Sequence, residues 1–193
     1  MSDFDILREL FKADALVALE DNPYGKKIVT LSEPQSENGK HSGYSVTIHG
    51  MPEEVFVIKT DKFPAPNAIF NGYKEECKRA DFVIIAHAKN TNWIVYIEMK
   101  KSKGNTEEKI IHQLQGAQCV IAYCRAIGNV FWAQPDFLNP ITYQSRFVSI
   151  RDIGIPKKTS RLPPLSGLHN SPEKMLKINA PHHLQFNQLV GKV

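Results

Sequence analysis

Two apolar runs separated by a short polar stretch constrain the fold of this chain more than any other feature. The first run is 82–86 (Phe-Val-Ile-Ile-Ala), the second is 93–97 (Trp-Ile-Val-Tyr-Ile), and residues 87–92 between them are mostly polar. β-Branched and aromatic residues favour strands, and two such runs joined by a short polar turn pair in an antiparallel way. The sequence therefore predicts a β-hairpin with its turn at 87–92.

Acidic residues lie at the two positions of this hairpin that folding brings together. Asp81 precedes the first run and Glu98 follows the second. If the numbers of paired residues add up to 179, Asp81 lies opposite Glu98. A shift by one residue places Asp81 opposite Met99, on the other face of the sheet. We therefore predict an odd-sum register, or a bulge that restores it.

Alternation along the second strand gives this end of the hairpin a polar face. Glu98 and Lys100 point to one face and Met99 points to the other. Two neighbouring carboxylates repel each other, and Mg²⁺, which prefers carboxylate, water and phosphate oxygens, relieves that repulsion. A lysine beside such an ion can hold the attacking water and offset the charge of a phosphate. The cluster of Asp81, Glu98 and Lys100 therefore indicates metal-assisted phosphodiester hydrolysis, and the alternative is a surface ion pair at a strand end.

The Glu-x-Lys pattern alone does not choose this site, because it occurs three times, beginning at Glu76, Glu98 and Glu107. Only the Glu98 copy ends an apolar strand and has an acid before the preceding strand. The other two copies lie in polar, helical stretches and are interpreted as solvated faces.

Asp81, followed by a strand, a turn and Glu98-Met99-Lys100, resembles the PD-(D/E)XK nuclease superfamily, which includes restriction endonucleases, Holliday-junction resolvases and RecB-type nucleases. The resemblance covers residues 79–124, and Ala80 stands where many members have proline. It implies a restriction-endonuclease-like α/β fold, a mixed β-sheet flanked by α-helices. It also implies that Asp81, Glu98 and the Met99 carbonyl bind Mg²⁺, for which Mn²⁺ can substitute, and that Lys100 orients the nucleophilic water.

The resemblance adds further candidates outside the hairpin. The RecB-like branch has a glutamine on the helix after the lysine, and we assign Gln113 to that role, although Ala117 stands where its tyrosine partner would be. An N-terminal helix often contributes a glutamate in this family, with Glu9 and Glu20 as the alternatives here. Solvent-facing helix charges are the competing interpretation of both.

Lys101 and Lys103 form a basic turn immediately after Lys100, and we expect them to bind the substrate. They lie beside the proposed metal, where positive charge would meet the phosphate backbone of a nucleic acid.

Periodicity and capping residues predict the remaining elements. The expected elements are a helix over 4–11 capped by Ser2 or Asp3, which continues or restarts at Asp14 up to Glu20; strands at 27–31, 44–48 and 55–60; a loop at 61–73; a helix that starts after Thr106 and ends at Gly128; strands at 130–132 and 146–150; and a short helix that opens at 171–173 and runs to 178.

A length of 193 residues favours one domain. We assign residues 1–150 to a nuclease-like α/β domain with about five strands. Residues 151–193 form a basic, proline-rich segment and a short C-terminal helix packed on the same domain. The basic segment is either an arm that follows a nucleic-acid backbone or a solvated tail.

Charge and cysteine usage restrict partners and compartment. The net charge of +4 suits a polyanionic partner, although only a clustered basic face attracts nucleic acid strongly. Cys77, Cys119 and Cys124 are odd in number and lack zinc-ligand spacing, which favours reduced thiols in a cytoplasmic, reducing compartment. We found no signal-peptide pattern and no apolar run of membrane-spanning length, so we expect no membrane partner.

Together these features predict a metal-dependent nuclease that hydrolyses phosphodiester bonds in DNA, with a homodimer expected where both strands of a duplex are cut. Two alternatives stay open. One is a nucleic-acid-binding or assembly module that keeps the fold without cleaving. The other is an RNA-cleaving enzyme, because the chemistry of the site ignores the 2′-hydroxyl.

Overall fold

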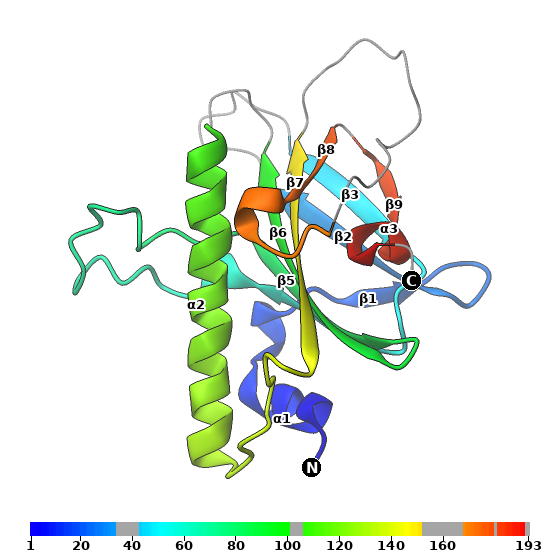
Figure 1. Ribbon diagram of the computed structural model, residues 1–193. Helices are drawn as coiled ribbons and strands as arrows, with labels where there is room; N and C mark the ends of the chain where they lie inside the picture. The colour runs from blue at the N-terminus through cyan, green and yellow to red at the C-terminus, as the bar shows by residue number, and fades with distance from the viewer. Residues whose placement is uncertain (34–42, 101–105, 152–167, 180, 192–193) are drawn as a thin grey trace.

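The structure is a computed structural model, which describes residues 1–33, 43–100, 106–151, 168–179 and 181–191. Two β-sheets and a layer of helices make up a mixed α/β fold (Figure 1). The five-stranded sheet lies between the four-stranded sheet on one face and helices α1 and α2 on the other.

The five-stranded sheet contains the predicted hairpin at its centre. Its order is β4 (Glu54–Lys59), β5 (Phe82–Ala88), β6 (Thr91–Lys100), β7 (Tyr143–Arg151) and β8 (Leu176–Asn179). The pairings among β4, β5 and β6 are antiparallel, and those among β6, β7 and β8 are parallel. The central strand β6 is buried from Trp93 to Met99 because both faces of the sheet are covered.

The predicted strands at 27–31 and 44–48 are confirmed, but they belong to a second sheet that the sequence did not lead us to expect. Its order is β1 (Leu19–Asp21), β2 (Lys27–Glu33), β3 (Tyr44–His49) and β9 (His183–Gln185). Alternate side chains of β2 and β3 point inward and pack on the five-stranded sheet: Val29, Leu31, Val46 and Ile48. This apolar face needs a partner, and the second layer provides it.

Helices α1 (Asp3–Leu10) and α2 (Glu107–Phe131) cover the opposite face, and both begin as predicted. Ser2 caps α1 in a capping box with Asp5, and the Thr106 side chain accepts a hydrogen bond from the Lys109 N–H at 3.4 Å. The apolar stripe of α2 packs on the sheet with α1, through Ile110, Leu114, Ala117 and Ile121.

Four local predictions are wrong. The hairpin turn is shorter than 87–92: Lys89 and Asn90 alone form it, with φ values of 49° and 58°, and the strands pair up to Ala88 and Thr91. Residues 14–20 are not helical, since Ala13–Ala15 form a 3₁₀ turn and β1 follows.

The other two corrections concern α2 and the C-terminal region. Helix α2 continues past Gly128 to Phe131, so the strand predicted at 130–132 does not form. Gly128 serves packing instead, because a Cβ at this position would lie 2.1 Å from the Phe137 ring. Residues Pro172–Lys174 form a 3₁₀ turn, and β8 replaces the rest of the helix predicted to open at 171–173 and run to 178.

The segment from β8 onward joins both sheets. β8 pairs in parallel with β7, β9 pairs in parallel with β3, and α3 (Phe186–Val190) follows β9. Side chains from this segment complete the core between the sheets: Ile178, Leu184, Phe186, Leu189 and Val190. Among the helices in the described ranges, none is long and apolar enough to cross a membrane.

Candidate active site

The register of the hairpin is the one that places the two acids opposite each other. Phe82 pairs with Ile97 and Val83 with Tyr96, so the numbers of paired residues add up to 179 along the whole hairpin. Asp81 lies one position before this ladder and Glu98 one position after Ile97. The predicted register is therefore confirmed without a bulge.

The two acids differ in burial. Glu98 is fully buried, on the face of β6 that also carries Ile94 and Tyr96 and that is covered by α2. Asp81 is partly buried, and its Oδ2 accepts a hydrogen bond from the Met99 backbone N–H at 2.7 Å. The Met99 side chain lies in the core between the sheets, as the alternation predicts.

The carboxyl groups of Asp81 and Glu98 interact electrostatically, although neither Glu98 oxygen has a hydrogen-bond partner among the described residues. Burial raises the pKa of Glu98 well above its ordinary value, and the negative charge of Asp81 raises it further. Burial also raises the pKa of Asp81, against the opposing effects of Lys100 and the Met99 N–H. Without a cation, burial and the neighbouring charge of Asp81 therefore both favour the protonated form of Glu98.

Lys100 provides the positive charge of the site. Its ammonium group forms an ion pair with Oε1 of Glu98, and its side chain retains 17% exposure. Burial lowers the pKa of Lys100, but the charges of Glu98 and Asp81 outweigh this effect and raise it above its ordinary value. Solvent therefore reaches the site past Lys100 and Asp81, with Glu98 beneath them.

Thr60 holds the backbone at Asp81, a role that sequence reasoning missed. The Thr60 N–H donates to the Asp81 carbonyl at 2.9 Å, and the buried Thr60 hydroxyl donates to the Ala80 carbonyl. The Arg79 side chain donates from Nε to the Thr60 carbonyl at 2.8 Å and from its terminal amino group to the Asp61 carbonyl at 3.2 Å. These contacts join the 3₁₀ turn Thr60–Lys62 (η2) to the residues that lead into β5.

Of the acids considered as additional site residues, neither Glu9 nor Glu20 contacts the cluster. Glu9 accepts a hydrogen bond from Trp132 Nε1 at 2.8 Å, beyond the end of α2 that lies far from the site (Figure 1). Glu20 lies in β1 and pairs with Ile28 of β2. An acid near the cluster that the sequence did not indicate is Glu33, at the end of β2, whose charge contributes to the raised pKa of Lys100. Sequence reasoning missed Glu33 because it comes from the second sheet.

Gln113 is half-buried on α2, and within the described residues it forms no hydrogen bond with Asp81, Glu98 or Lys100. It lies one turn before Gly116, where the helix touches the chain that leads into Asp81. A Cβ at Gly116 would lie 1.8 Å from the Lys78 carbonyl oxygen. Gln113 thus lies on the side of α2 that faces this segment.

Basic residues continue from the cluster along the neighbouring strands. Arg151 on β7 pairs with Lys100. Lys177 on β8 pairs with Ser149 on β7, which in turn pairs with Glu98. Lys177 is ion-paired with Glu107 at 2.6 Å. The predicted substrate-binding residues Lys101 and Lys103 lie outside the described residues.

The acid pair meets the chemical requirements of a divalent cation. In the part of the chain that the structure describes, neither oxygen of the buried Glu98 carboxylate has a hydrogen-bond donor, and Lys100 is its ion-pair partner. A hard cation would compensate these oxygens. No group of three or more His, Cys, Asp or Glu side chains suited to a metal occurs among the described residues, so the protein side chains would supply two acidic ligands.

Comparison with known proteins adds no relative: neither a family model, nor a curated protein, nor a solved structure matches this chain.

Proposed function

We propose that this protein is a metal-dependent phosphodiester hydrolase that cleaves DNA. The observation that supports this most strongly is the fully buried Glu98 beside the partly buried Asp81, with Lys100 at the solvent side of the two acids. A surface ion pair at a strand end, the alternative interpretation, would leave its carboxylate exposed, whereas Glu98 is fully buried. The mixed α/β architecture is compatible with the restriction-endonuclease-like fold that the resemblance implies.

Each residue of the cluster has a separate role in this proposal. Asp81, Glu98 and the Met99 carbonyl would hold Mg²⁺ or Mn²⁺. The bound ion would polarise the scissile phosphate and lower the pKa of a bound water. Lys100 would hold that water in line for attack. Thr60 would keep the Asp81 backbone in place, and Arg151 offers a further positive charge beside Lys100 for the phosphate backbone.

The same proposal includes a reducing intracellular compartment and a two-fold dimer for cleavage of both strands of a duplex. The described structure is consistent with the former, because Cys77, Cys119 and Cys124 are free thiols.

Cleavage of labelled single-stranded and duplex DNA tests the proposal, with Mg²⁺, Mn²⁺ or EDTA and with matched RNA strands in parallel. The key variant is Lys100→Met, which keeps the apolar stem and removes the charge. Its control is Lys109→Met, in the solvent-exposed Glu-x-Lys copy at the start of α2. We expect the wild type and Lys109→Met to cleave DNA in a metal-dependent way, and Lys100→Met to lose about 10²–10⁴-fold in turnover.

Metal binding separates the roles of the three residues. In calorimetric titrations with Mn²⁺, Asp81→Asn and Glu98→Gln should lose binding, whereas Lys100→Met should retain it. Equal metal affinity in all three variants would reject this division of roles. Cleavage that persists in Lys100→Met would place the reaction elsewhere. Nucleic-acid binding without cleavage under any metal would favour the non-catalytic module.

A further inference from the structure

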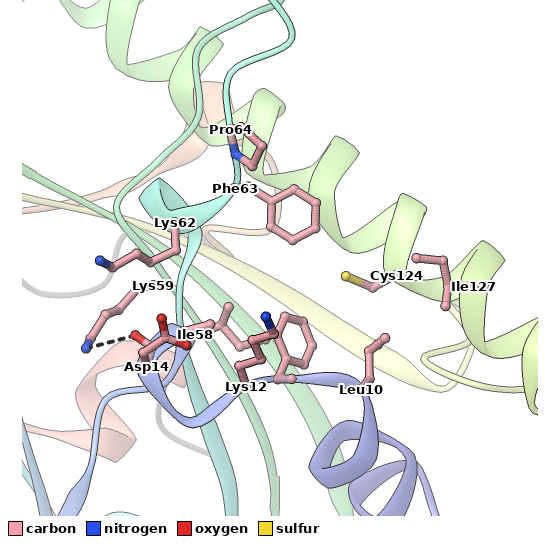
Figure 2. A pocket seen from close by; sticks show the side chains of 12 residues that line it. Leu10, Lys12, Asp14, Ile58, Lys59, Lys62, Phe63, Pro64, Cys124 and Ile127 are labelled. Atoms are coloured by element: carbon pink, nitrogen blue, oxygen red, sulfur yellow. Dashed lines mark hydrogen bonds between the residues drawn. The ribbon is translucent and has the colours of Figure 1, made fainter.

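A pocket of about 300 Å³ lies apart from the acid cluster, between the end of α1, the 3₁₀ turns η1 (Ala13–Ala15) and η2, and α2 (Figure 2). The turn η1 follows α1 and the turn η2 follows β4, and both contribute residues to the lining. None of Asp81, Glu98 and Lys100 lines it. A volume of this size suits a small ligand or part of a larger one.

The floor of the pocket is apolar. It is formed by Leu10, Phe11, Ile58, Phe63 and Ile127. Cys124 faces the same space (Figure 2), and burial raises the pKa of its thiol to about 11, so the thiol is neutral at physiological pH. A sugar or a nucleobase placed on this floor would leave its polar edges unpaired, which disfavours both as occupants.

The rim of the pocket is positively charged. Three lysines, Lys12, Lys59 and Lys62, and a single acid, Asp14, line it. Lys59 donates to the backbone carbonyl of Asp14 at 3.4 Å. Among the described residues, none of the three lysines forms an ion pair with a carboxylate. Figure 2 shows Lys59, Lys62 and Asp14 gathered at one side of the opening.

An apolar floor beneath three lysines that form no ion pair with a carboxylate of the described residues matches one chemical class of ligand. We infer that this pocket binds a small organic anion with an unbranched or aromatic apolar body and a single carboxylate or phosphate-monoester head. The body lies on the floor beside Phe63 and Ile127, and the head lies between Lys59 and Lys62. The inference is independent of the proposed nuclease activity, because it concerns a different surface and a different ligand.

Isothermal titration calorimetry with octanoate, octyl phosphate and neutral octan-1-ol tests both halves of the inference. The charge test is the double variant Lys59→Ala/Lys62→Ala, and its control is Lys26→Ala/Lys74→Ala, which removes two exposed lysines that do not line the pocket. The apolar test is Ile127→Trp, which fills the pocket with a larger side chain. Circular dichroism of each variant confirms that it remains folded.

We expect at least one of the two anions to bind ten times more tightly than octan-1-ol. The double variant Lys59→Ala/Lys62→Ala should remove this preference while leaving the weak binding of octan-1-ol, and its control should bind as the wild type does. Affinity should rise about fourfold per methylene from hexanoate to octanoate. The affinities of octanoate and octyl phosphate, compared with each other, show whether the pocket prefers a carboxylate or a phosphate-monoester head.

Three results would overturn the inference. Octan-1-ol that binds as tightly as both anions would indicate an unselective apolar hollow. Absence of binding by either anion to the wild type would exclude the ligand class. A dimer in sedimentation experiments that dissociates in Lys59→Ala/Lys62→Ala or Ile127→Trp would assign the surface to a second copy of the chain.

Discussion

The backbone N–H of Met99 donates to Oδ2 of Asp81 at 2.7 Å, so the strand that carries Glu98 also holds the acid opposite it. The distance between the two acids is therefore set by the hairpin backbone and not by flexible side chains alone. Such a pair keeps its position even when its charges repel each other, which is the property that a cation site requires.

The buried acid pair makes the metal-free protein sensitive to pH. The pKa of Glu98 is raised in the folded protein, so above pH 4.5, the ordinary value, the folded state binds more protons than the unfolded chain. The stabilising contribution of protonated Glu98 is complete below that pH and is lost as the pH rises towards the raised folded pKa. Urea unfolding in EDTA should therefore show a free energy of unfolding that falls with pH, by up to about 1.4 kcal/mol per pH unit.

Glu98→Gln should flatten this dependence and raise the free energy of unfolding at neutral pH, and divalent cations should stabilise the wild type but not Glu98→Gln. Glu107→Gln serves as the control because Glu107 is an exposed acid whose pKa is lowered, first by its hydrogen bond with Lys177. An unchanged slope in Glu98→Gln would contradict the assignment.

Thr60→Val should destabilise the protein and weaken any activity at Asp81. The substitution keeps the shape of the side chain but leaves the buried Ala80 carbonyl without its hydroxyl donor. We expect a loss of about 1–3 kcal/mol in the free energy of unfolding. Thr142→Val is the matched control, since the exposed Thr142 hydroxyl also donates to a backbone carbonyl, that of Asn139. Equal effects in urea unfolding of the two variants would show that the contact at Ala80 is not special.

Gly116→Ala should destabilise the protein, although alanine normally favours a helix over glycine by about 1 kcal/mol. The added methyl group would lie 1.8 Å from the Lys78 carbonyl oxygen, so the helix or the segment that leads into Asp81 must move. We expect a loss of about 1–3 kcal/mol in thermal or urea unfolding. The reverse change at an exposed position of the same helix, Ala122→Gly, measures the effect of helix propensity alone on the free energy of unfolding. A Gly116→Ala variant as stable as the wild type would show that α2 and the Lys78 carbonyl do not pack tightly at this position.

The hairpin turn can be improved by substitution. Lys89 and Asn90 both have positive φ, as a two-residue type I′ turn requires, and asparagine followed by glycine suits that turn best. Lys89→Asn/Asn90→Gly should therefore raise the melting temperature, because asparagine and glycine adopt a positive φ at lower cost than lysine and asparagine do at the same positions. Asn90→Ala should lower it, because alanine in this conformation costs about 1–2 kcal/mol. The opposite order of the two melting temperatures would exclude this turn.

The sequence was most informative where the interacting residues are close along the chain. The positions of Asp81 and Glu98 follow from the hairpin register, which the apolar alternation determines within 18 residues, and the caps of α1 and α2 are equally local. Period-2 alternation identifies the inward residues of β2 and β3, but it does not say on which sheet they pair. The second sheet, and with it Glu33 near the cluster, could not be predicted for that reason.

The remaining differences between the sequence prediction and the structure also arise from contacts between residues that are distant along the chain. Gly128 resembles a helix end, yet its role is set by the ring of Phe137, nine residues further on. Thr60 looked like the end of a strand, and its contacts with Ala80 and Asp81 form only when η2 packs against the start of β5.

The C-terminal part of the chain that contains β8, β9 and α3 closes both sheets, which has a consequence for the order of assembly. It is synthesised after every other described element, and β8 and β9 each form parallel pairs with strands made earlier. The core between the sheets therefore remains exposed on the growing chain until this segment emerges, although the hairpin that carries Asp81 and Glu98 can already form. During synthesis, the acids of the site are therefore positioned before the core around them is complete. The late addition of β8, β9 and α3 is the step most vulnerable to aggregation.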